Sequence, residues 1–251
     1  MQASEALKAE NPRQDNPQIA SWGHFIGFLL IAAGMVALGM LAQHAPAGAA
    51  AGASGSQLAP HSHAIQVYLA AIVMDWLLLY YCWAGVHHRG GNLKTLSGGR
   101  WTSWKSLATA AGIAGVFWVL WEGGAERGVY WLLGPSSAKT VDSLLPKSLI
   151  EILIWIATSI TAGICEEVAF RGYLQKQFHA LTGSIATAVL AQGLVFGVFH
   201  AYQGWKNVIV ISVLGVLFGI LAAWRKNLQA NVIVHAWGDV WSGWLRFVVW
   251  R

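Results

Sequence analysis

Seven long apolar stretches constrain the fold of this chain most strongly. A helix needs about 20 mainly apolar residues to cross the hydrocarbon core of a bilayer. Charged residues make up only 11% of the 251 positions, whereas soluble domains carry about 25%. The sequence therefore predicts an all-α, polytopic transmembrane helical bundle of about seven spans, within a range of six to eight. The stretches are 24–42, 64–86, 106–121, 148–165, 184–199, 208–224 and 230–250.

The loops between these stretches differ in charge. Residues 43–63 contain no Lys or Arg, whereas 87–105 contain four. Because loops rich in Lys and Arg stay in the cytoplasm, the polar N-terminal tail, 1–23, is predicted to be cytoplasmic, in an inner (plasma) membrane of the bacterial type. Residues 122–147 are then expected to form an outer connection, with 129–133 in the membrane interface. The Lys and Arg residues lie mostly in short loops between apolar stretches, which fits membrane orientation, so the net charge of +5 does not indicate a nucleic-acid partner.

Small residues recur at helical spacing in the fifth and sixth stretches. Gly193 and Gly197 form one GxxxG pair, and Gly215 and Gly219 form another. Such pairs allow two helix backbones to approach closely. Close packing of these two stretches is one interpretation, although such spacing also arises by chance in a Gly-rich chain.

Ionisable residues inside apolar stretches are costly and are functional candidates by default. Glu166 and Glu167 are adjacent at the end of the fourth stretch, about 100° apart on a helix. Glu167 shares a face with Arg171, four residues later, so these two can pair. Glu166 points elsewhere and is a candidate general base. Taken alone, the cluster also fits a helix end that emerges among lipid headgroups.

Two further clusters contain ionisable residues. Phe196 and His200 lie one helical turn apart at the end of the fifth stretch, and His235 and Asp239 lie one turn apart inside the seventh. A single His at a helix end is commonly interfacial, and a His–Asp pair can simply satisfy itself. Asp75, in the second stretch, is either a partner for another helix or a polar packing residue.

The spacing of the three clusters adds information that none carries alone. His200 follows Glu166 by 34 residues, and His235 follows His200 by 35. Each interval is about one helical hairpin. Neighbouring helices could therefore bring all three clusters together.

The ordered motifs EExxxR, FxxxH and HxxxD resemble those of the CAAX-protease and bacteriocin-processing (CPBP) family of intramembrane proteases, whose eukaryotic member is the Ras-converting CAAX prenyl protease. The resemblance covers about residues 148–245. It implies hydrolysis of a peptide bond within the membrane by activated water, and no motif relates residues 1–147 to the family.

Four residues carry over as catalytic candidates. By resemblance, Glu166 is the general base, His200 helps to hold and polarise the water, and His235 and Asp239 stabilise the developing oxyanion. The family often has Asn at the last position. An ionised Asp accepts hydrogen bonds but cannot donate them, so Asp239 is either protonated or orients His235. We favour the second.

Three residues are expected to support the site. Glu167 and Arg171 would brace the first catalytic helix, and Phe196 would stand beside His200 in the second motif.

Metal dependence leaves two alternatives. Glu166, His200 and His235 form a possible zinc ligand set. The chain lacks the helical HExxH motif, which favours a site without metal or other cofactor.

The predicted spans conflict with a shared site if each apolar stretch simply crosses the membrane once. If the fourth stretch ends at Glu166 on the inner side, the fifth carries His200 to the outer side. The two meet only if the fourth helix continues through 173–178, which places Glu166 deep, or if 172–183 dips into the bilayer. Arg171 and Lys176 argue against complete burial of that stretch.

The sequence thus divides into the tail 1–23, N-terminal transmembrane helices over 24–147, and a catalytic helical core over 148–251. The favoured function is an intramembrane endopeptidase surrounded by membrane lipids and acting on a membrane-embedded or prenylated peptide. Alternatives are a proton-coupled transporter, since buried Glu, His and Asp also form proton relays, and a non-catalytic membrane protein that confers peptide resistance. The oligomeric state is not indicated.

Overall fold

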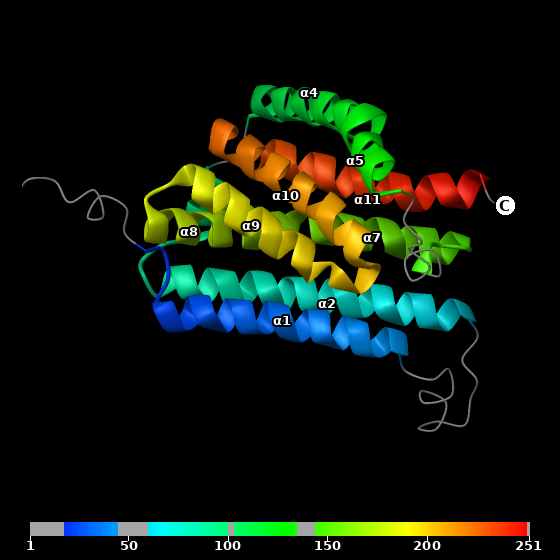
Figure 1. Ribbon diagram of the computed structural model, residues 1–251, viewed down its shortest axis with the longest axis horizontal. Helices are drawn as coiled ribbons and strands as arrows, with labels where there is room; N and C mark the ends of the chain where they lie inside the picture. Colours follow the sequence, from blue (N-terminus) through cyan, green and yellow to red (C-terminus); the bar gives the residue numbers. More distant parts are fainter. Residues whose placement is uncertain (1–17, 45–59, 100–102, 135–143, 250–251) are drawn as a thin grey trace, which may run out of the picture.

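A computed structural model describes residues 18–44, 60–99, 103–134 and 144–249, and their regular structure is helical. Most of the predicted tail, residues 1–17, lies outside the described residues. The longer helices lie roughly along the longest axis of the molecule (Figure 1). The helices are α1 (Trp22–His44), α2 (Pro60–His87), α3 (Leu93–Ser97), α4 (Trp104–Leu120), α5 (Glu126–Leu133), α7 (Leu149–Glu167), α8 (Gln175–Thr182), α9 (Ile185–Phe199), α10 (Trp205–Arg225) and α11 (Gln229–Val249).

Helices occur at each of the seven predicted stretches, which confirms the all-α polytopic bundle. Among the described residues, five helical stretches are long and apolar enough to cross a membrane. α9 is apolar but has 15 residues, and α11 has 21 residues but is not among the five. The five are Trp22–Leu41, His63–His87, Trp104–Leu133, Leu149–Thr182 and Trp205–Arg225.

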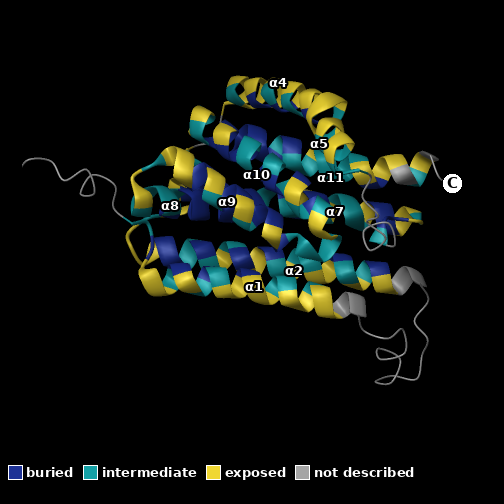
Figure 2. Cartoon of the chain, in the orientation of Figure 1, coloured by how far each residue is buried: buried dark blue, intermediate teal, exposed yellow. Residues whose placement is uncertain are grey.

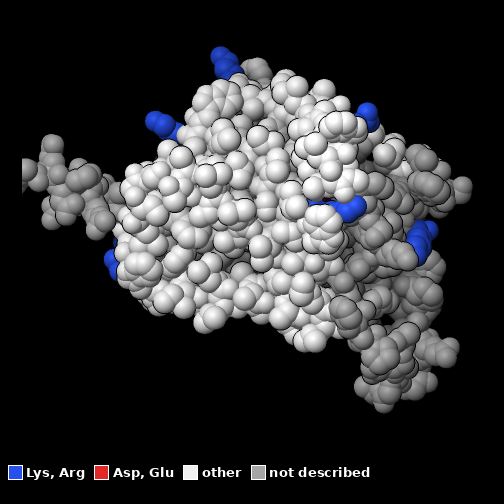
Figure 3. All heavy atoms as spheres, in the orientation of Figure 1, with Lys and Arg blue, Asp and Glu red and all other residues white. Residues whose placement is uncertain are grey.

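The surface agrees with a lipid environment. Large apolar side chains such as Leu30 and Leu41, each more than 60% exposed, cover the outer faces of the bundle. Burial is concentrated in the central helices, while α4 is largely exposed (Figure 2). The face seen in Figure 3 shows no acidic atoms and few basic ones. The chain is a multi-pass integral membrane protein.

The third span is longer than the sequence predicted. α4 continues through a π-helical segment, η1 (Trp121–Ala125), into α5, so the helix runs to Leu133. The expected connection from residue 122 onward is therefore wrong at its start, and 129–133 form the last turns of the helix. The sequence has no Pro between Trp104 and Gly134, and the helix ends where Gly134 takes a φ of +75°.

The fourth helix resolves the geometric conflict. α7 continues through a second π-helical segment, η2 (Val168–Leu174), into α8, which gives one helical stretch of 34 residues. Glu166 lies near its midpoint. After a left-handed turn at Gly183, with a φ of +69°, α9 runs back over 15 residues and ends before His200. The two legs of this hairpin have nearly equal lengths, so they bring Glu166 and His200 to the same level.

The predicted close packing of the glycine pairs is present between α9 and α10. A Cβ on Gly193 would lie 2.8 Å from the Val216 amide nitrogen, and a Cβ on Gly197 would lie 2.5 Å from the Val208 carbonyl oxygen. Any larger side chain would separate the backbones. The fifth stretch therefore positions His200 through contact of its backbone with α10.

Replacing Gly193 by Leu is expected to destabilise the bundle by about 1–3 kcal/mol, the usual cost of overpacking. Gly115→Leu on α4 is the matched control, because a Cβ there meets no atom within 4 Å. Thermal unfolding in detergent should show a lower midpoint for Gly193→Leu alone. Equal midpoints for the two variants would contradict the close approach.

Candidate active site

Five of the six ionisable residues of the three motifs come from three parts of the chain that meet inside the bundle, and the sixth, Arg171, lies in η2. Glu166 and Glu167 end α7, His200 follows α9, and His235 and Asp239 lie on α11. α7 and α11 approach closely, because a Cβ on Gly163 would lie 2.8 Å from the Ala236 amide nitrogen. The structure thus brings together all the residues that the sequence singled out.

Glu166 faces both imidazoles. Its Oε2 atom lies 3.9 Å from His200 Nε2 and 3.9 Å from His235 Nε2. These distances exceed the range of a direct hydrogen bond, and this oxygen has no hydrogen-bond partner among the described residues. The side chain is about one-tenth exposed. A buried carboxylate oxygen is therefore aimed at two nitrogen atoms without contacting either.

The second nitrogen of each imidazole is fixed. His200 Nδ1 lies 2.9 Å from the Phe196 carbonyl oxygen, and His235 Nδ1 lies 2.8 Å from Glu167 Oε1. Since a carbonyl and an ionised carboxylate only accept, both Nδ1 atoms donate. Each ring is therefore oriented with Nε2 toward Glu166. In functional His residues, the hydrogen bond made by one ring nitrogen usually sets the orientation of the other in this way.

Glu167 is the centre of a buried network. Its side chain is fully buried, and Oε1 also accepts a hydrogen bond from Arg171 Nη1 at 2.8 Å. Asn231 Nδ2 donates to Oε2 at 3.2 Å. The predicted pairing of Glu167 with Arg171 is present, and the same carboxylate also holds the His235 ring. Glu167 therefore connects α7, η2 and α11.

Arg171 is buried, contrary to the expectation that its charge would keep this stretch partly exposed. It is 1% exposed. Besides Glu167, it donates from Nη2 to the Gly215 carbonyl oxygen at 3.3 Å. Its guanidinium also lies 4.1 Å from the centroid of the Phe196 ring and 5.1 Å from that of Phe218, which is cation–π geometry. These partners replace water, so the charge remains inside the bundle.

Phe196 lies between the charged groups. Its ring centroid is 4.8 Å from that of His200 and 6.1 Å from that of His235. The ring therefore packs against both imidazoles as well as the guanidinium of Arg171. This position agrees with the supporting location expected for it.

A π-helical segment directly follows the two glutamates. η2 covers Val168–Leu174, and all seven of its residues are buried. π-helical turns in α-helices are rare and occur often at functional sites. A π-helical turn contains one residue more than an α-helical turn, which changes the faces of α7 and α8 that meet the rest of the bundle. Arg171 remains paired with Glu167.

Asp239 lies at the edge of the cluster. Its Oδ2 atom is 3.6 Å from His235 Nε2, and its side chain is 43% exposed. The His235 ring is oriented instead by the hydrogen bond that its Nδ1 donates to Glu167. The sequence favours Asp239 for this orienting role, but the geometry places Asp239 near the opposite nitrogen, Nε2, which Glu166 also faces.

Sequence reasoning missed one residue and gave little weight to another. Asn231 is fully buried and was readable as the start of a helical stripe, Asn231–His235–Asp239, with four-residue spacing. Asp75 on α2 is 6% exposed and lies within electrostatic reach of His235 and Asp239. The N-terminal helices therefore contribute a carboxyl group next to the cluster.

These features define a helical membrane protein with a buried Glu–His site between its helices. Residues 148–241 match the family model described as Type II CAAX prenyl endopeptidase Rce1-like. The match supports the relation to this family that the motifs predicted, and it supports a CAAX-type intramembrane protease as the general class. It covers less than half of the 251 residues. Neither curated proteins nor solved structures gave a significant match.

Removing the central carboxylate should cost far more stability than removing its neighbour. Glu167→Ala leaves Arg171 buried without its charge partner, and breaking such a pair costs about 3–5 kcal/mol. Glu166→Ala deletes a carboxylate oxygen without a hydrogen bond, so its effect should be less than half as large. Unfolding midpoints in detergent compare the two. Equal losses would show that Glu167 is not the structural centre.

Proposed function

We propose that this protein is an intramembrane endopeptidase that hydrolyses a peptide bond with water activated by Glu166 and His200. The observation that carries the proposal is the placement of Glu166 Oε2 at 3.9 Å from both His200 Nε2 and His235 Nε2. A separation beyond 3.5 Å between polar groups is typical of pairs bridged by water. One water molecule hydrogen-bonded to these three atoms satisfies the spacing.

The positions of the protons on the side chains assign a role to His200 and to Glu166. Because His200 Nδ1 donates to the Phe196 carbonyl, the Nε2 of a neutral His200 carries a lone pair and accepts a hydrogen from the water. Glu166 removes the other proton as the oxygen attacks the peptide carbonyl carbon. When the C–N bond breaks, this proton passes from Glu166 to the leaving nitrogen.

His235 is assigned to the developing negative charge. Glu167 accepts a hydrogen bond from Nδ1–H of His235, and Asp239 lies beside Nε2. These two carboxylates therefore stabilise the doubly protonated ring. Its Nε2–H then donates to the carbonyl oxygen in the transition state. Fixed donors in a site shielded from water are the usual source of such stabilisation. Asp239 thus acts through the charge of His235.

The substrate class follows from the position of the site and the family. The cluster lies among membrane-spanning helices, which favours a peptide that is membrane-embedded or lipid-anchored. The family description names CAAX prenyl endopeptidases, so a prenylated peptide is the first substrate to examine. The cytoplasmic N-terminus remains part of the proposal, and the family match favours a protease over a proton-coupled transporter or a non-catalytic resistance protein.

A zinc mechanism is the alternative chemistry, in which Glu166, His200 and His235 would hold the ion. The atoms that face one another are a carboxylate oxygen and two imidazole nitrogens, which are common zinc ligands. The chain lacks the helical HExxH zinc motif, so we propose the water mechanism without metal.

Glu166→Gln should abolish cleavage in proteoliposomes supplied with prenylated and unprenylated membrane peptides. Loss of a general base lowers the rate by about 10²–10⁴-fold. Mass spectrometry of the products measures the rate and the cleaved bond. Glu122→Gln, in η1 between α4 and α5, is the matched control and should retain wild-type activity.

Two outcomes would contradict the assignment. Cleavage by Glu166→Gln at the wild-type rate would remove Glu166 as the base. Failure of the folded wild-type protein to cleave any membrane peptide would argue against a protease.

Exhaustive chelation should leave the rate unchanged, because the proposed water is activated by side chains alone. Cleavage is measured before and after metal removal, with metal content checked by elemental analysis. Loss of activity that zinc restores would replace the water mechanism by the zinc alternative.

A further inference from the structure

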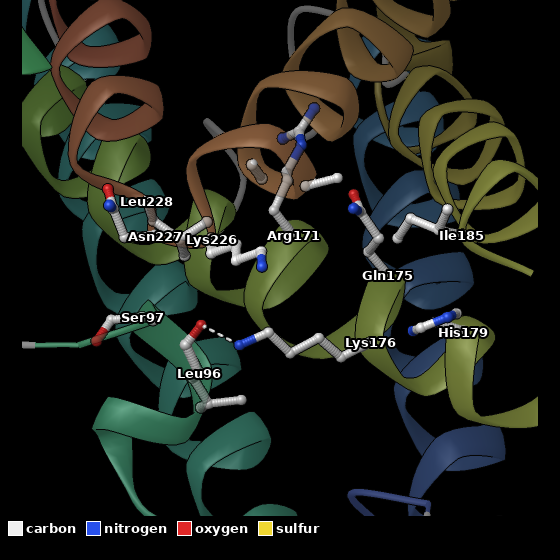
Figure 4. Close-up of a pocket in the computed structure, with 13 residues that line it drawn as sticks. Leu96, Ser97, Arg171, Gln175, Lys176, His179, Ile185, Lys226, Asn227 and Leu228 are labelled. Carbon is white, nitrogen blue, oxygen red and sulfur yellow. Dashed lines mark hydrogen bonds between the residues drawn. The ribbon is translucent and has the colours of Figure 1, made fainter. Parts of the chain in front are cut away.

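A cavity separate from the Glu166–His200 cluster opens where α3 meets the turn between α10 and α11 (Figure 4). Its volume is about 290 Å³. The walls are held together by backbone contacts: the Leu228 amide donates to the Ser97 carbonyl oxygen at 3.1 Å, and a Cβ on Gly98 would collide with residue 226. The walls of this recess are thus formed by α3, η2, α8 and the end of α10.

The recess is lined by basic side chains, of which Arg171 is already paired with Glu167. Arg171, Lys176, His179 and Lys226 are among the lining residues, and none of the residues that line it is acidic. Lys176 Nζ donates to the carbonyl oxygens of Thr95 and Leu96, which orient the ammonium group but do not neutralise it. Lys176 and Lys226 approach the same space from different elements (Figure 4). Such a lining favours an anion.

Lys226 occupies this position at a conformational cost. Its φ is +55°, and among the described residues it is the one non-glycine residue with a positive φ. The left-handed conformation is unfavourable for an L-residue, and Gly or Asn is usual at such a helix end. Strain of this kind is often retained where the side chain has a function.

The surroundings indicate which kind of anion fits the recess. Trp224, which is 65% exposed, lies in the last turn of α10, next in sequence to the lining residue Ala223, with the Arg225 guanidinium 5.6 Å from its ring centroid. Exposed Trp next to basic residues is typical of the level of lipid headgroups. Ile185, which lines the recess and is 45% exposed, provides an apolar surface for an acyl chain. A lipid phosphate fits these surroundings better than a free ion.

We propose that this recess binds the phosphate of an anionic phospholipid headgroup, with Lys176 and Lys226 as its principal charge partners. Arg171 lines the same recess and donates to Glu167, which in turn holds His235. The recess and the Glu166–His200 cluster are therefore linked through Arg171. The proposal concerns lipid binding and does not depend on the hydrolytic activity.

Native mass spectrometry of the whole protein in neutral detergent tests this site, with phosphatidylglycerol and phosphatidylcholine as probes. Each Lys near an anionic lipid surface contributes about 1 kcal/mol, so two lysines should favour phosphatidylglycerol by about tenfold or more. The double variant Lys176→Gln/Lys226→Asn should lose this preference. Lys94→Gln/Lys105→Gln removes two exposed lysines near the same end of the bundle and should keep it.

Further arms separate the outcomes. If the double variant is poorly folded, Lys226→Asn alone, at an exposed residue where Asn adopts the same backbone conformation, should still weaken phosphatidylglycerol binding. Equal loss in both double variants would show general surface attraction and overturn the site. Inorganic phosphate binding that matches or displaces the lipid would overturn the assignment to a headgroup.

Discussion

The buried Glu167–Arg171 ion pair is the interaction on which the rest of the site depends. A single charge in this interior would be prohibitive, yet the two neutralise each other at 2.8 Å. Once present, the pair organises its neighbours: Glu167 orients His235 and accepts from Asn231, and Arg171 reaches Gly215 of α10. The carboxylate that is not catalytic in our proposal therefore determines the geometry of the residues that are.

Helix length is the second constraint. Because α7, η2 and α8 form one continuous stretch, Glu166 lies at its midpoint rather than at a membrane boundary. The short α9 then returns to the same level before His200. Close backbone approaches at Gly163 and Gly193 complete the arrangement, since they bring α11 and α10 against the helices that carry the acid and the first imidazole.

Much of this was predictable from sequence, for identifiable reasons. Sparse charge within long apolar stretches fixed the fold class, and four-residue spacing fixed the Glu167–Arg171 pair. The continuation of α4 past residue 122 was missed because a Gly-rich segment resembles a helix end, while a π-helical turn can accommodate it. The burial of Arg171 was missed because cation–π contacts with Phe196 and Phe218 depend on tertiary packing. The role of Glu167 beside His235 likewise requires two helices that only the fold brings together.

The central claim is that Glu166, His200 and His235 share one activated water. A high-resolution experimental structure of the protein in lipid tests it most directly. The account predicts a solvent oxygen within about 2.6–3.2 Å of Glu166 Oε2 and both Nε2 atoms. A metal ion at that position, or a direct Glu166–imidazole hydrogen bond that excludes solvent, would contradict it.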